Sequence, residues 1–225
     1  MLGDQVKLLQ AVVKTGKPVV LVLIKGRPLN LNWASANVPA ILDAWYPGQE
    51  GGNAIADVIF GDYNPAGRLP ISVPKSVGQL PVYYNARYPE KHDYIETDAE
   101  PLYSFGYGLS YTTFNYEHLK LSFKNGIATA SFDLKNSGTV DGDEVVQLYL
   151  NAKTSSVVLP IKQLKQFERI FLKAGEQKRV TFELNSSDLE IYDAKMQWKV
   201  EPGKYSVMIG SCSDRIKLEG TFEVK

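Results

Sequence analysis

Two long apolar runs constrain the fold of this chain more than any other feature. They read PVVLVLI at 18–24 and AILDAWY at 40–46, and Asp43 is their only charged residue. A strand with one face in water alternates apolar and polar side chains, and these runs do not. A helical pattern at 4–15 precedes the first run, and a short helical passage around 33–37 separates the two. Strands of this kind, separated by helices, predict a parallel sheet that is covered on both faces.

A third helix is predicted after the second run, with glycines on both sides of it. Gly48, Gly51 and Gly52 let the chain turn tightly from the strand into the helix. Asn53 is the predicted N-cap, and Gly61 is the predicted left-handed residue at the C-terminal end. The side chains expected to face inward are those of Ile55, Val58 and Ile59.

The ends of the two strands mark where a site is expected, because ligands of open α/β sheets bind beyond the carboxyl ends of the strands. Lys25, Gly26 and Arg27 follow the first strand, and 46–50 follow the second. The turn GQEGGNA at 48–54 matches neither GxGxxG nor GxxxxGK[ST], and no serine stands in a GxSxG motif. We therefore favour a structural turn over a phosphate-binding loop.

From 62 to 111 the periodicity is lost and prolines recur, which indicates a long extended connector. Its many tyrosines predict that it packs along a surface. A seam between domains is the favoured interpretation, and stacking of these rings on sugar faces stays open as the alternative. The tyrosines are Tyr83, Tyr84, Tyr88, Tyr94, Tyr103, Tyr107 and Tyr111.

After Phe114 the sequence alternates apolar and polar residues around Asn125-Gly126, a strong hairpin signal. Turn clusters such as NSGTVDGD and KAGEQ separate the strands that follow. About seven short strands predict an antiparallel sandwich of the immunoglobulin or fibronectin type III kind. The later strands are expected at 144–152, 161–171, 177–184, 204–210 and 216–224.

Charge and composition exclude several classes of partner. Lys plus Arg equals Asp plus Glu at 25 each, so no positive field favours nucleic acid or an anionic membrane. The start, MLGDQVKLLQ, lacks the pattern of a signal peptide, and no apolar run approaches the length of a membrane span. The single cysteine, Cys212, predicts a small buried residue without an internal disulfide.

Residues with catalytic chemistry are sparse. His92 and His118 have no serine or cysteine motif beside them, which predicts ordinary surface histidines. Asp141, Asp143 and Glu144 crowd one turn but lack the spacing of an EF-hand loop, which predicts a solvated turn. A further acidic set in the connector has no evident source of a raised pKa and is predicted to serve solubility: Asp93, Glu96, Asp98 and Glu100.

Several long segments resemble the C-terminal half of glycoside hydrolase family 3 enzymes of the β-glucosidase or β-xylosidase type. They are TGKPVVLVLIKGRPL, VPAILDAWYPGQEGGNAIADVIFGDYNPAGRLPISVPKS and PLYSFGYGLSYTTF. The tail resembles the fibronectin type III-like domain that closes many members, in DGDEVVQLYL, LKQFERIFLKAGEQKRVTFEL and PGKYSVMIGSCS. The resemblance covers nearly the whole chain, in order.

The resemblance implies a retaining glycosidase with an aspartate nucleophile and a glutamate acid/base. In the family the aspartate comes from an N-terminal barrel and the glutamate from a segment before the helix at 4–15. Neither segment lies in this chain, so we assign no catalytic, cofactor-binding or metal-binding residue and expect the chain alone to be inactive. Glu50 lies in the glycine-rich turn and is not assigned the acid/base role. Arg68 is expected to anchor the exit from the third helix by pairing with a carboxylate or backbone carbonyls, rather than to bind sugar.

The resemblance divides the chain into the C-terminal part of an α/β sandwich domain at 1–75, a connector at 76–114 and the β sandwich at 115–225. It implies that the barrel and the upstream α/β segment are partners, that a β-linked glycoside is the parent's substrate, and that no cofactor is needed. We expect a periplasmic or secreted parent, and self-association through apolar surface at 19–24 and 40–45. A stand-alone module that binds carbohydrate or protein stays open as the alternative.

Overall fold

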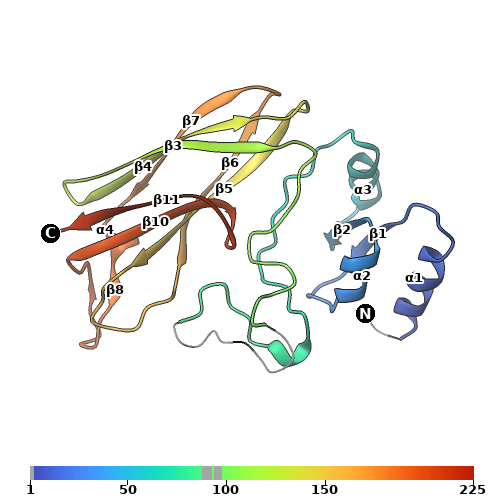
Figure 1. Cartoon of the computed structure of the whole chain (residues 1–225), viewed down its shortest axis with the longest axis horizontal. Helices are drawn as coiled ribbons and strands as arrows, with labels where there is room; N and C mark the ends of the chain where they lie inside the picture. The colour runs from blue at the N-terminus through green and yellow to red at the C-terminus, as the bar shows by residue number, and fades with distance from the viewer. Residues whose placement is uncertain (1–2, 88–92, 94–97) are drawn as a thin grey trace. The chain divides into compact units, whose positions relative to one another are not determined.

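The computed structural model describes residues 3–87, 93 and 98–225 (Figure 1). The chain forms two compact units, each assembled from several segments. Unit 1 comprises Met1–Tyr63, Ser72–Val82 and Glu100–Tyr103. Unit 2 comprises Asn64–Ile71, Tyr83–Ala99 and Ser104–Lys225. Because the units draw on alternating segments, the predicted limits at 75 and 114 stay a prediction.

Unit 1 contains the predicted alternation of helices and strands. Its two strands pair in parallel, with Val20 opposite Ala40 and Val22 opposite Leu42, which confirms the parallel arrangement. The elements are α1 (Gln5–Val13), β1 (Val20–Ile24), α2 (Asn32–Asn37), β2 (Ala40–Trp45), α3 (Gly51–Phe60) and the short 3₁₀ helix η1 (Val77–Gln79).

One face of this small sheet packs on helices. Leu9 of α1 and the α2 region residues Ala34 and Val38 form a buried cluster, against which Leu21 and Ile41 pack from the strands. Successive side chains of a strand point to opposite faces, so the neighbouring pair Val22 and Leu42 faces away from this cluster.

Helix α3 begins three residues earlier than predicted. Glu50 occupies the N-cap position, and Asn53 lies inside the helix, where its Nδ2 donates to Glu50 Oε2 at 2.6 Å. The prediction of Asn53 as the cap is therefore wrong. The reason is packing: a Cβ on Gly51 would lie 2.6 Å from Pro47 Cγ, so the turn closes onto the proline and the helix starts there.

The end of α3 matches the prediction better than its inward face does. Gly61 closes the helix in the left-handed conformation, with φ 87°. Ile55 and Val58 are half-buried, but Ile59 is 40% exposed, so the inward stripe is narrower than predicted.

Unit 2 is an antiparallel β sandwich built around the predicted hairpin. Asn125 and Gly126 have φ 52° and 79°, the left-handed pair that a two-residue hairpin turn requires. One sheet has the order β11-β10-β5-β6 and the other the order β3-β4-β7. The strands are β3 (Phe114–Lys124), β4 (Ile127–Asn136), β5 (Gly142–Ala152), β6 (Gln163–Leu172), β7 (Gln177–Leu184), β10 (Gly203–Cys212) and β11 (Arg215–Val224).

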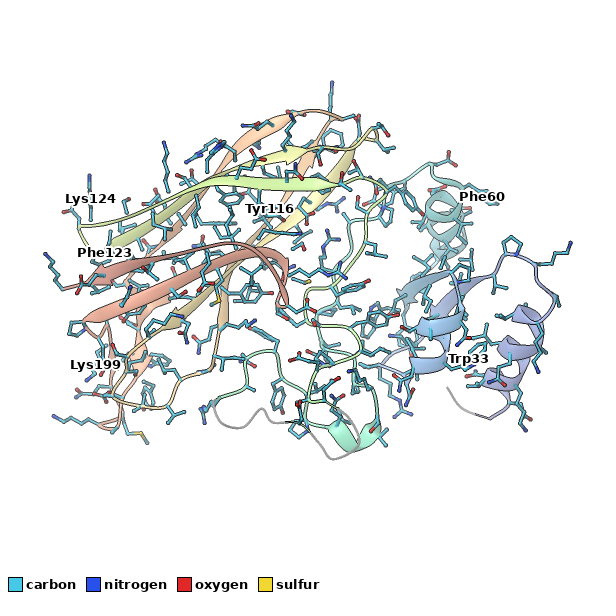
Figure 2. All side chains as sticks on the ribbon, in the orientation of Figure 1. Trp33, Phe60, Tyr116, Phe123, Lys124 and Lys199 are labelled. Carbon is cyan, nitrogen blue, oxygen red and sulfur yellow. The ribbon has the colours of Figure 1, made fainter. Side chains whose placement is uncertain are left out.

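The sandwich core is closed and aromatic-rich. Phe132, Leu134, Leu148 and Ile209 are fully buried between the two sheets. Tyr116 stacks on Phe132 with ring centroids 5.9 Å apart, and Figure 2 labels it within the sandwich. Burying one such side chain stabilises a fold by about 1.5–3 kcal/mol, so this core is the main source of stability in unit 2.

Three short elements were not predicted. They are α4 (Ser186–Leu189), β8 (Ile191–Tyr192) and β9 (Trp198–Lys199), which lie between β7 and β10. The two strands pair with each other in a separate antiparallel hairpin.

Part of the connector is integral to unit 2. Asn64 Nδ2 donates to the Asp141 carbonyl at 2.9 Å, and its Oδ1 accepts from Ser110 Oγ at 2.9 Å and from the Tyr111 N–H at 2.8 Å. A Cβ on Gly142 would lie 2.4 Å from Asn64 Nδ2, so the connector lies directly against the start of β5.

The connector's aromatic rings also pack within unit 2. Tyr84 stacks on Phe105 with ring centroids 4.2 Å apart and meets Tyr149 edge-on at 5.9 Å. Tyr107 lies under the Arg215 guanidinium at 4.8 Å. These two tyrosines therefore serve packing, whereas Tyr88 and Tyr94 lie outside the described residues. Within the described part of the chain, no helix is both long and apolar enough to span a bilayer.

Candidate functional site

The carboxyl ends of β1 and β2 hold a buried ion pair. Lys25 Nζ lies 2.7 Å from Asp43 Oδ2, and the Lys25 side chain is only 5% exposed. The same ammonium sits 4.1 Å above the centre of the Trp45 ring, an electrostatic attraction between a cation and an aromatic face. Lys25, one of the residues predicted to border a ligand site after β1, thus pairs with Asp43 of the neighbouring strand β2.

The backbone at this edge is irregular. Trp45 has φ 51°, a rare conformation for a bulky residue, and the strand register shifts so that Ile24 lies opposite Trp45. The next residue, Tyr46, closes over Gly26, where an added Cβ would lie 2.7 Å from the Tyr46 hydroxyl. A side chain at position 26 would therefore displace the Tyr46 ring, which is 78% exposed and could swing into solvent.

The ion pair is incompletely hydrogen-bonded. Within the described residues, Lys25 Nζ and Asp43 Oδ1 are buried without an aligned hydrogen-bond partner, although Nζ is close to the other carboxylate oxygen. Both atoms are closed to solvent, so a substrate has no path to them. The arrangement fixes the edge of the sheet and supplies no reacting group.

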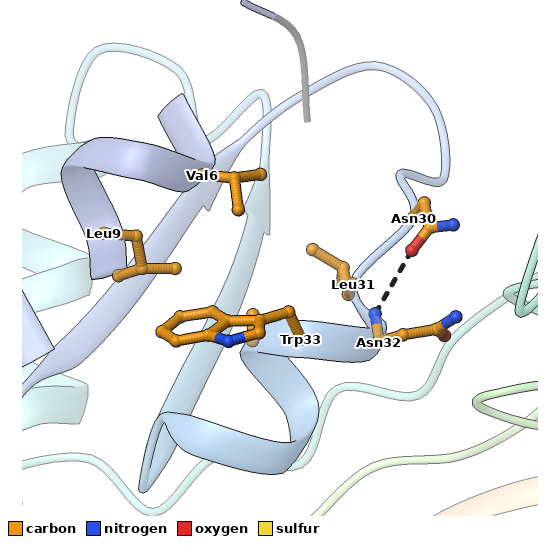
Figure 3. Close-up of a pocket in the computed structure, with 7 residues that line it drawn as sticks. Val6, Leu9, Asn30, Leu31, Asn32 and Trp33 are labelled. Atoms are coloured by element: carbon orange, nitrogen blue, oxygen red, sulfur yellow. Dashed lines mark hydrogen bonds between the residues drawn. The ribbon is translucent and has the colours of Figure 1, made fainter. Parts of the chain in front are cut away.

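A cavity of about 430 Å³ lies between α1 and α2 in unit 1 (Figure 3). Its walls are mostly apolar, with the Trp33 ring across from Leu9 and Val6 in the close-up. The other lining residues are Asn30, Leu31, Asn32 and Ala34. Sequence reasoning missed this cavity, because the residues come from two elements and carry no motif.

The polar rim of the cavity is occupied by internal contacts. Asn30 Nδ2 and Asn32 Nδ2 both donate to the Lys75 carbonyl, at 2.9 and 2.7 Å. Asn30 Oδ1 accepts from the Asn32 N–H at 3.3 Å, which is the dashed line in Figure 3. With no titratable side chain in its lining, the cavity suits an apolar group and offers no acid/base chemistry.

Arg68 is the predicted residue whose role the structure confirms. Its Nη2 lies 2.9 Å from Glu144 Oε1, and its Nη1 donates to the carbonyls of Ala66 and Gly67 at 3.2 and 3.1 Å. The two side chains are 9% and 6% exposed. Arg68 therefore anchors the connector to β5 through both of the contact types that were expected.

Glu144 does not belong to a solvated turn as predicted. Burial raises its pKa above the ordinary value, and the Arg68 guanidinium opposes that rise. Tyr116 lies beside it, and among the described residues its buried hydroxyl has no aligned hydrogen-bond partner. Burial first, and then the Glu144 charge, raise the pKa of Tyr116. The prediction was wrong because Glu144 is the inward-facing residue at the start of β5, and its partner is 76 residues away.

The two neighbouring carboxylates face other partners. Asp143 pairs with Arg169 at 2.9 Å, and Asp141 Oδ1 accepts from the Ala174 N–H at 2.8 Å. The three carboxylates of this turn thus diverge, and among residues 3–87, 93 and 98–225 no cluster suited to a metal ion occurs.

The remaining candidates have structural partners. His118 is on the surface as predicted, with Nδ1 2.9 Å from Asp133 Oδ2. Asp93 Oδ1 accepts from the Ala99 N–H at 3.0 Å, and the Glu100 carbonyl accepts from Gln79 Nε2 at 2.9 Å. His92 and Glu96 lie outside the described residues.

Cys212 is buried, as predicted. Burial, with help from the neighbouring Asp214 carboxylate, raises the pKa of its thiol to about 11. A thiol of this kind stays protonated at neutral pH and is a poor nucleophile.

The chain matches two family models in succession. Residues 1–111 match the glycosyl hydrolase family 3 C-terminal domain, and residues 144–213 match the fibronectin type III-like domain. It is 48% identical to a periplasmic β-glucosidase of Salmonella typhimurium over 98% of this chain and 31% of that protein. It is 46% identical to a β-xylosidase of Formosa agariphila over 94% of this chain and 30% of that protein.

A solved structure is similar over nearly the whole chain. A β-glucosidase mutant from Listeria innocua, in complex with laminaribiose, is 36% identical with a TM-score of 0.92, over 97% of this chain and 32% of that one. The chain therefore spans about a third of the length of the relatives it matches.

Proposed function

The chain belongs to glycoside hydrolase family 3 and carries the C-terminal portion of such an enzyme, and from this premise we propose that it serves as a non-reacting part of a retaining β-glycosidase. The proposed reaction is removal of terminal, non-reducing β-linked glucose or xylose. The observation that carries the proposal is the ordered match of both models, together with likeness to β-glucosidases and β-xylosidases over almost the whole chain.

The retaining mechanism requires two carboxylates about 5–5.5 Å apart, one as nucleophile and one as acid/base. Two carboxylates described above are held by cations: the partly buried Asp43 by Lys25 and the buried Glu144 by Arg68. Glu50 is exposed and bound by Asn53. We therefore assign both reacting carboxylates to segments that the longer relatives possess outside the matched portion, and we expect this chain alone to be inactive.

The sheet of unit 1 supports an assembly role. Its strands are as apolar as those of sheets with both faces covered, yet Val20 is 46% and Ile24 64% exposed, and only two strands pair. Exposed apolar strands and unpaired sheet edges tend to bind another protein segment, because binding buries the apolar surface and pairs the free backbone groups. We propose that the upstream α/β segment covers them in the whole enzyme, and that the chain without this segment self-associates.

Assembly from two polypeptides tests the proposal. The chain is co-expressed with the N-terminal portion of the Salmonella typhimurium relative, up to the point where the match begins, and assayed on 4-nitrophenyl β-glucoside and β-xyloside. We expect hydrolysis only when both pieces are present. Val22→Asp and Leu42→Asp should prevent docking, whereas Phe171→Asp, a matched change at an exposed strand position of unit 2, should not.

Three results would overturn the proposal at different points. A folded but inert complex would show that the reacting carboxylates were assigned to the wrong segments. A chain that stays monomeric and never binds the second piece would remove the assembly role. Hydrolysis by this chain alone would show that it holds the reacting carboxylates after all.

The proposed location of the whole enzyme is the periplasm or the exterior of the cell. It is supported by the similarity to a periplasmic β-glucosidase of Salmonella typhimurium. Cell fractionation followed by an assay for aryl-glucoside hydrolysis tests it, and activity confined to the cytoplasmic fraction would contradict it.

A further inference from the structure

The hairpin formed by β8 and β9 presents two large aromatic rings to solvent. Tyr192 and Trp198 lie directly opposite each other in the strand pair, and they are 46% and 67% exposed. Their ring centroids are 5.1 Å apart and their planes are inclined by 51°. Single exposed apolar residues are ordinary on protein surfaces, but an adjacent pair of large rings on one hairpin is a local patch.

Hydrogen bonds and an ion pair of Asp193 hold the hairpin in place. The Asp193 carboxylate is buried, and its Oδ1 accepts from the Lys195 and Gln197 N–H groups at 2.8 and 3.1 Å. The Asp193 N–H donates to the Gln197 carbonyl at 3.0 Å, and Lys199 Nζ lies 3.2 Å from Asp193 Oδ2. The two rings are therefore displayed on a fixed frame rather than on a free loop.

The turn of this hairpin is strained. Met196 has φ 62°, in the left-handed region where three-residue hairpin loops normally place glycine, and its side chain is 73% exposed. Strained backbone at an exposed position persists only where the surroundings enforce it, and it often accompanies binding sites. The hydrogen bonds of Asp193 enforce this conformation, which keeps the turn tight and the strands that carry both rings in register.

The polar atoms of the two rings are available to a ligand. Within the described part of the chain, neither the Tyr192 hydroxyl nor the Trp198 indole N–H makes a hydrogen bond or an ion pair. The patch thus combines ring faces with a donor/acceptor hydroxyl and a donor N–H. This combination matches a sugar ring, whose C–H face packs on aromatics and whose hydroxyls donate and accept hydrogen bonds.

The size of the patch indicates whether its ligand is a protein or a sugar. Two aromatic side chains bury about 150–250 Å² each, whereas one side of a stable protein interface buries roughly 800 Å². Among the exposed large hydrophobic residues, this hairpin contributes only Met196 beside the pair. The two rings alone therefore fall short of one side of a stable protein interface and are of the size of one or two sugar rings.

We propose that Tyr192 and Trp198 form a stacking platform for a β-linked glucan. The inference rests on the proposed function, because a β-glycosidase encounters such chains. The inclined rings suit a twisted, soluble glucan rather than a flat crystalline surface. The platform would hold a polymeric substrate on unit 2 without taking part in bond cleavage.

Affinity electrophoresis of the full chain tests the platform, in native gels that contain laminarin, hydroxyethyl cellulose or, as an α-linked control, dextran. We expect retardation in at least one β-glucan gel and none in dextran. Tyr192→Ala and Trp198→Ala should each weaken the apparent affinity by about tenfold, and Trp198→Phe should retain part of it. Phe167→Ala is the matched control, because Phe167 is also 67% exposed in unit 2 and should leave retardation unchanged.

Each contrary outcome overturns the platform. The platform is refuted if the chain is not retarded in any β-glucan gel, or if Phe167→Ala loses as much retardation as the hairpin variants. It is also refuted if Tyr192→Ala and Trp198→Ala both keep the full retardation while their circular dichroism is unchanged. A sedimentation coefficient that falls in Trp198→Ala would reassign the patch to contact between copies of this chain. The two proposals fail separately: a chain that assembles into an active enzyme but never binds glucan would contradict only the platform, and a chain that binds glucan but never assembles would contradict only the proposed function.

Discussion

Replacing Arg68 by methionine should destabilise unit 2 in a pH-dependent way. Methionine keeps much of the volume of the side chain but removes the charge that faces Glu144 at 2.9 Å. Because both side chains are buried, Glu144 would be left as an uncompensated charge, which typically costs about 3–5 kcal/mol. The carbonyls of Ala66 and Gly67 would lose their guanidinium donor as well.

The pH dependence follows from the raised pKa of Glu144. Burial favours its neutral form in the folded state, so its contribution to stability is fully present below the unfolded pKa near 4.5 and is lost as pH rises through the folded pKa. Arg68 opposes this loss in the native protein. Without Arg68, the folded pKa rises further and the loss continues to higher pH. The deficit of Arg68→Met should therefore be small near pH 4.5 and large at pH 8, growing by at most about 1.4 kcal/mol per pH unit.

Hydrogen exchange of β5 peptides, followed across a urea titration, would measure the loss of unfolding free energy in unit 2 alone. The control is Arg68→Met combined with Glu144→Gln, which removes both charges and should recover most of the stability at pH 8. Glu144→Gln alone leaves a buried arginine without its counter-charge, and because glutamine does not titrate, the stability of this variant should lack the pH dependence that Glu144 supplies between pH 4.5 and 8. An Arg68→Met deficit that is equal at both pH values, or that the second change fails to relieve, would refute this account of the pair.

Three further changes test other parts of the molecule. Phe132→Ala, at a fully buried core position, should lower the free energy of unfolding of unit 2 by about 3–5 kcal/mol in the same urea titration. The chain alone should not hydrolyse aryl β-glucosides, and turnover above the buffer rate that Glu50→Gln abolishes would contradict this. Glu201 accepts hydrogen bonds from Ser156, which lower its pKa to about 2, so its hold on 153–158 should persist above pH 4.5 and be lost as pH falls through about 2. The protection factors of 153–158, which correct for the intrinsic exchange rate at each pH, should fall over that acid range, and in Glu201→Gln they should be low and independent of pH there.

Local signals predicted most of the secondary structure. The apolar runs gave β1 and β2, and Asn125-Gly126 marked the β3–β4 hairpin because few residues other than asparagine and glycine tolerate two successive positive φ angles. Gly61 was predictable for the same conformational reason. Asn53 failed as a cap because the start of α3 is set by contact between Pro47 and Gly51, which no capping preference encodes.

The site features depended on contacts that sequence spacing does not report. Arg68 was expected to find a carboxylate, but Glu144 was assigned to a solvated turn, because its burial arises only when β5 packs in the sandwich. The cavity beside Trp33 needs two helices and the connector carbonyl of Lys75. The β8–β9 hairpin was missed because its strands have two residues each, too few to show alternation.

The connector explains why a sequence boundary at 115 cuts through physical interactions. Arg68 neutralises a charge buried at the start of β5, and Asn64 bonds both the Asp141 carbonyl and the Tyr111 backbone. Farther along, Gly108 lies so close to Arg68 that a Cβ there would be 2.9 Å from Nη1. Removing the connector would therefore leave Glu144 without its counter-charge and expose the apolar surface that Tyr84 and Phe105 cover. Because each loss falls on a different contact, the stability of the sandwich depends on the connector segments that belong to unit 2, at 64–71 and 104–111.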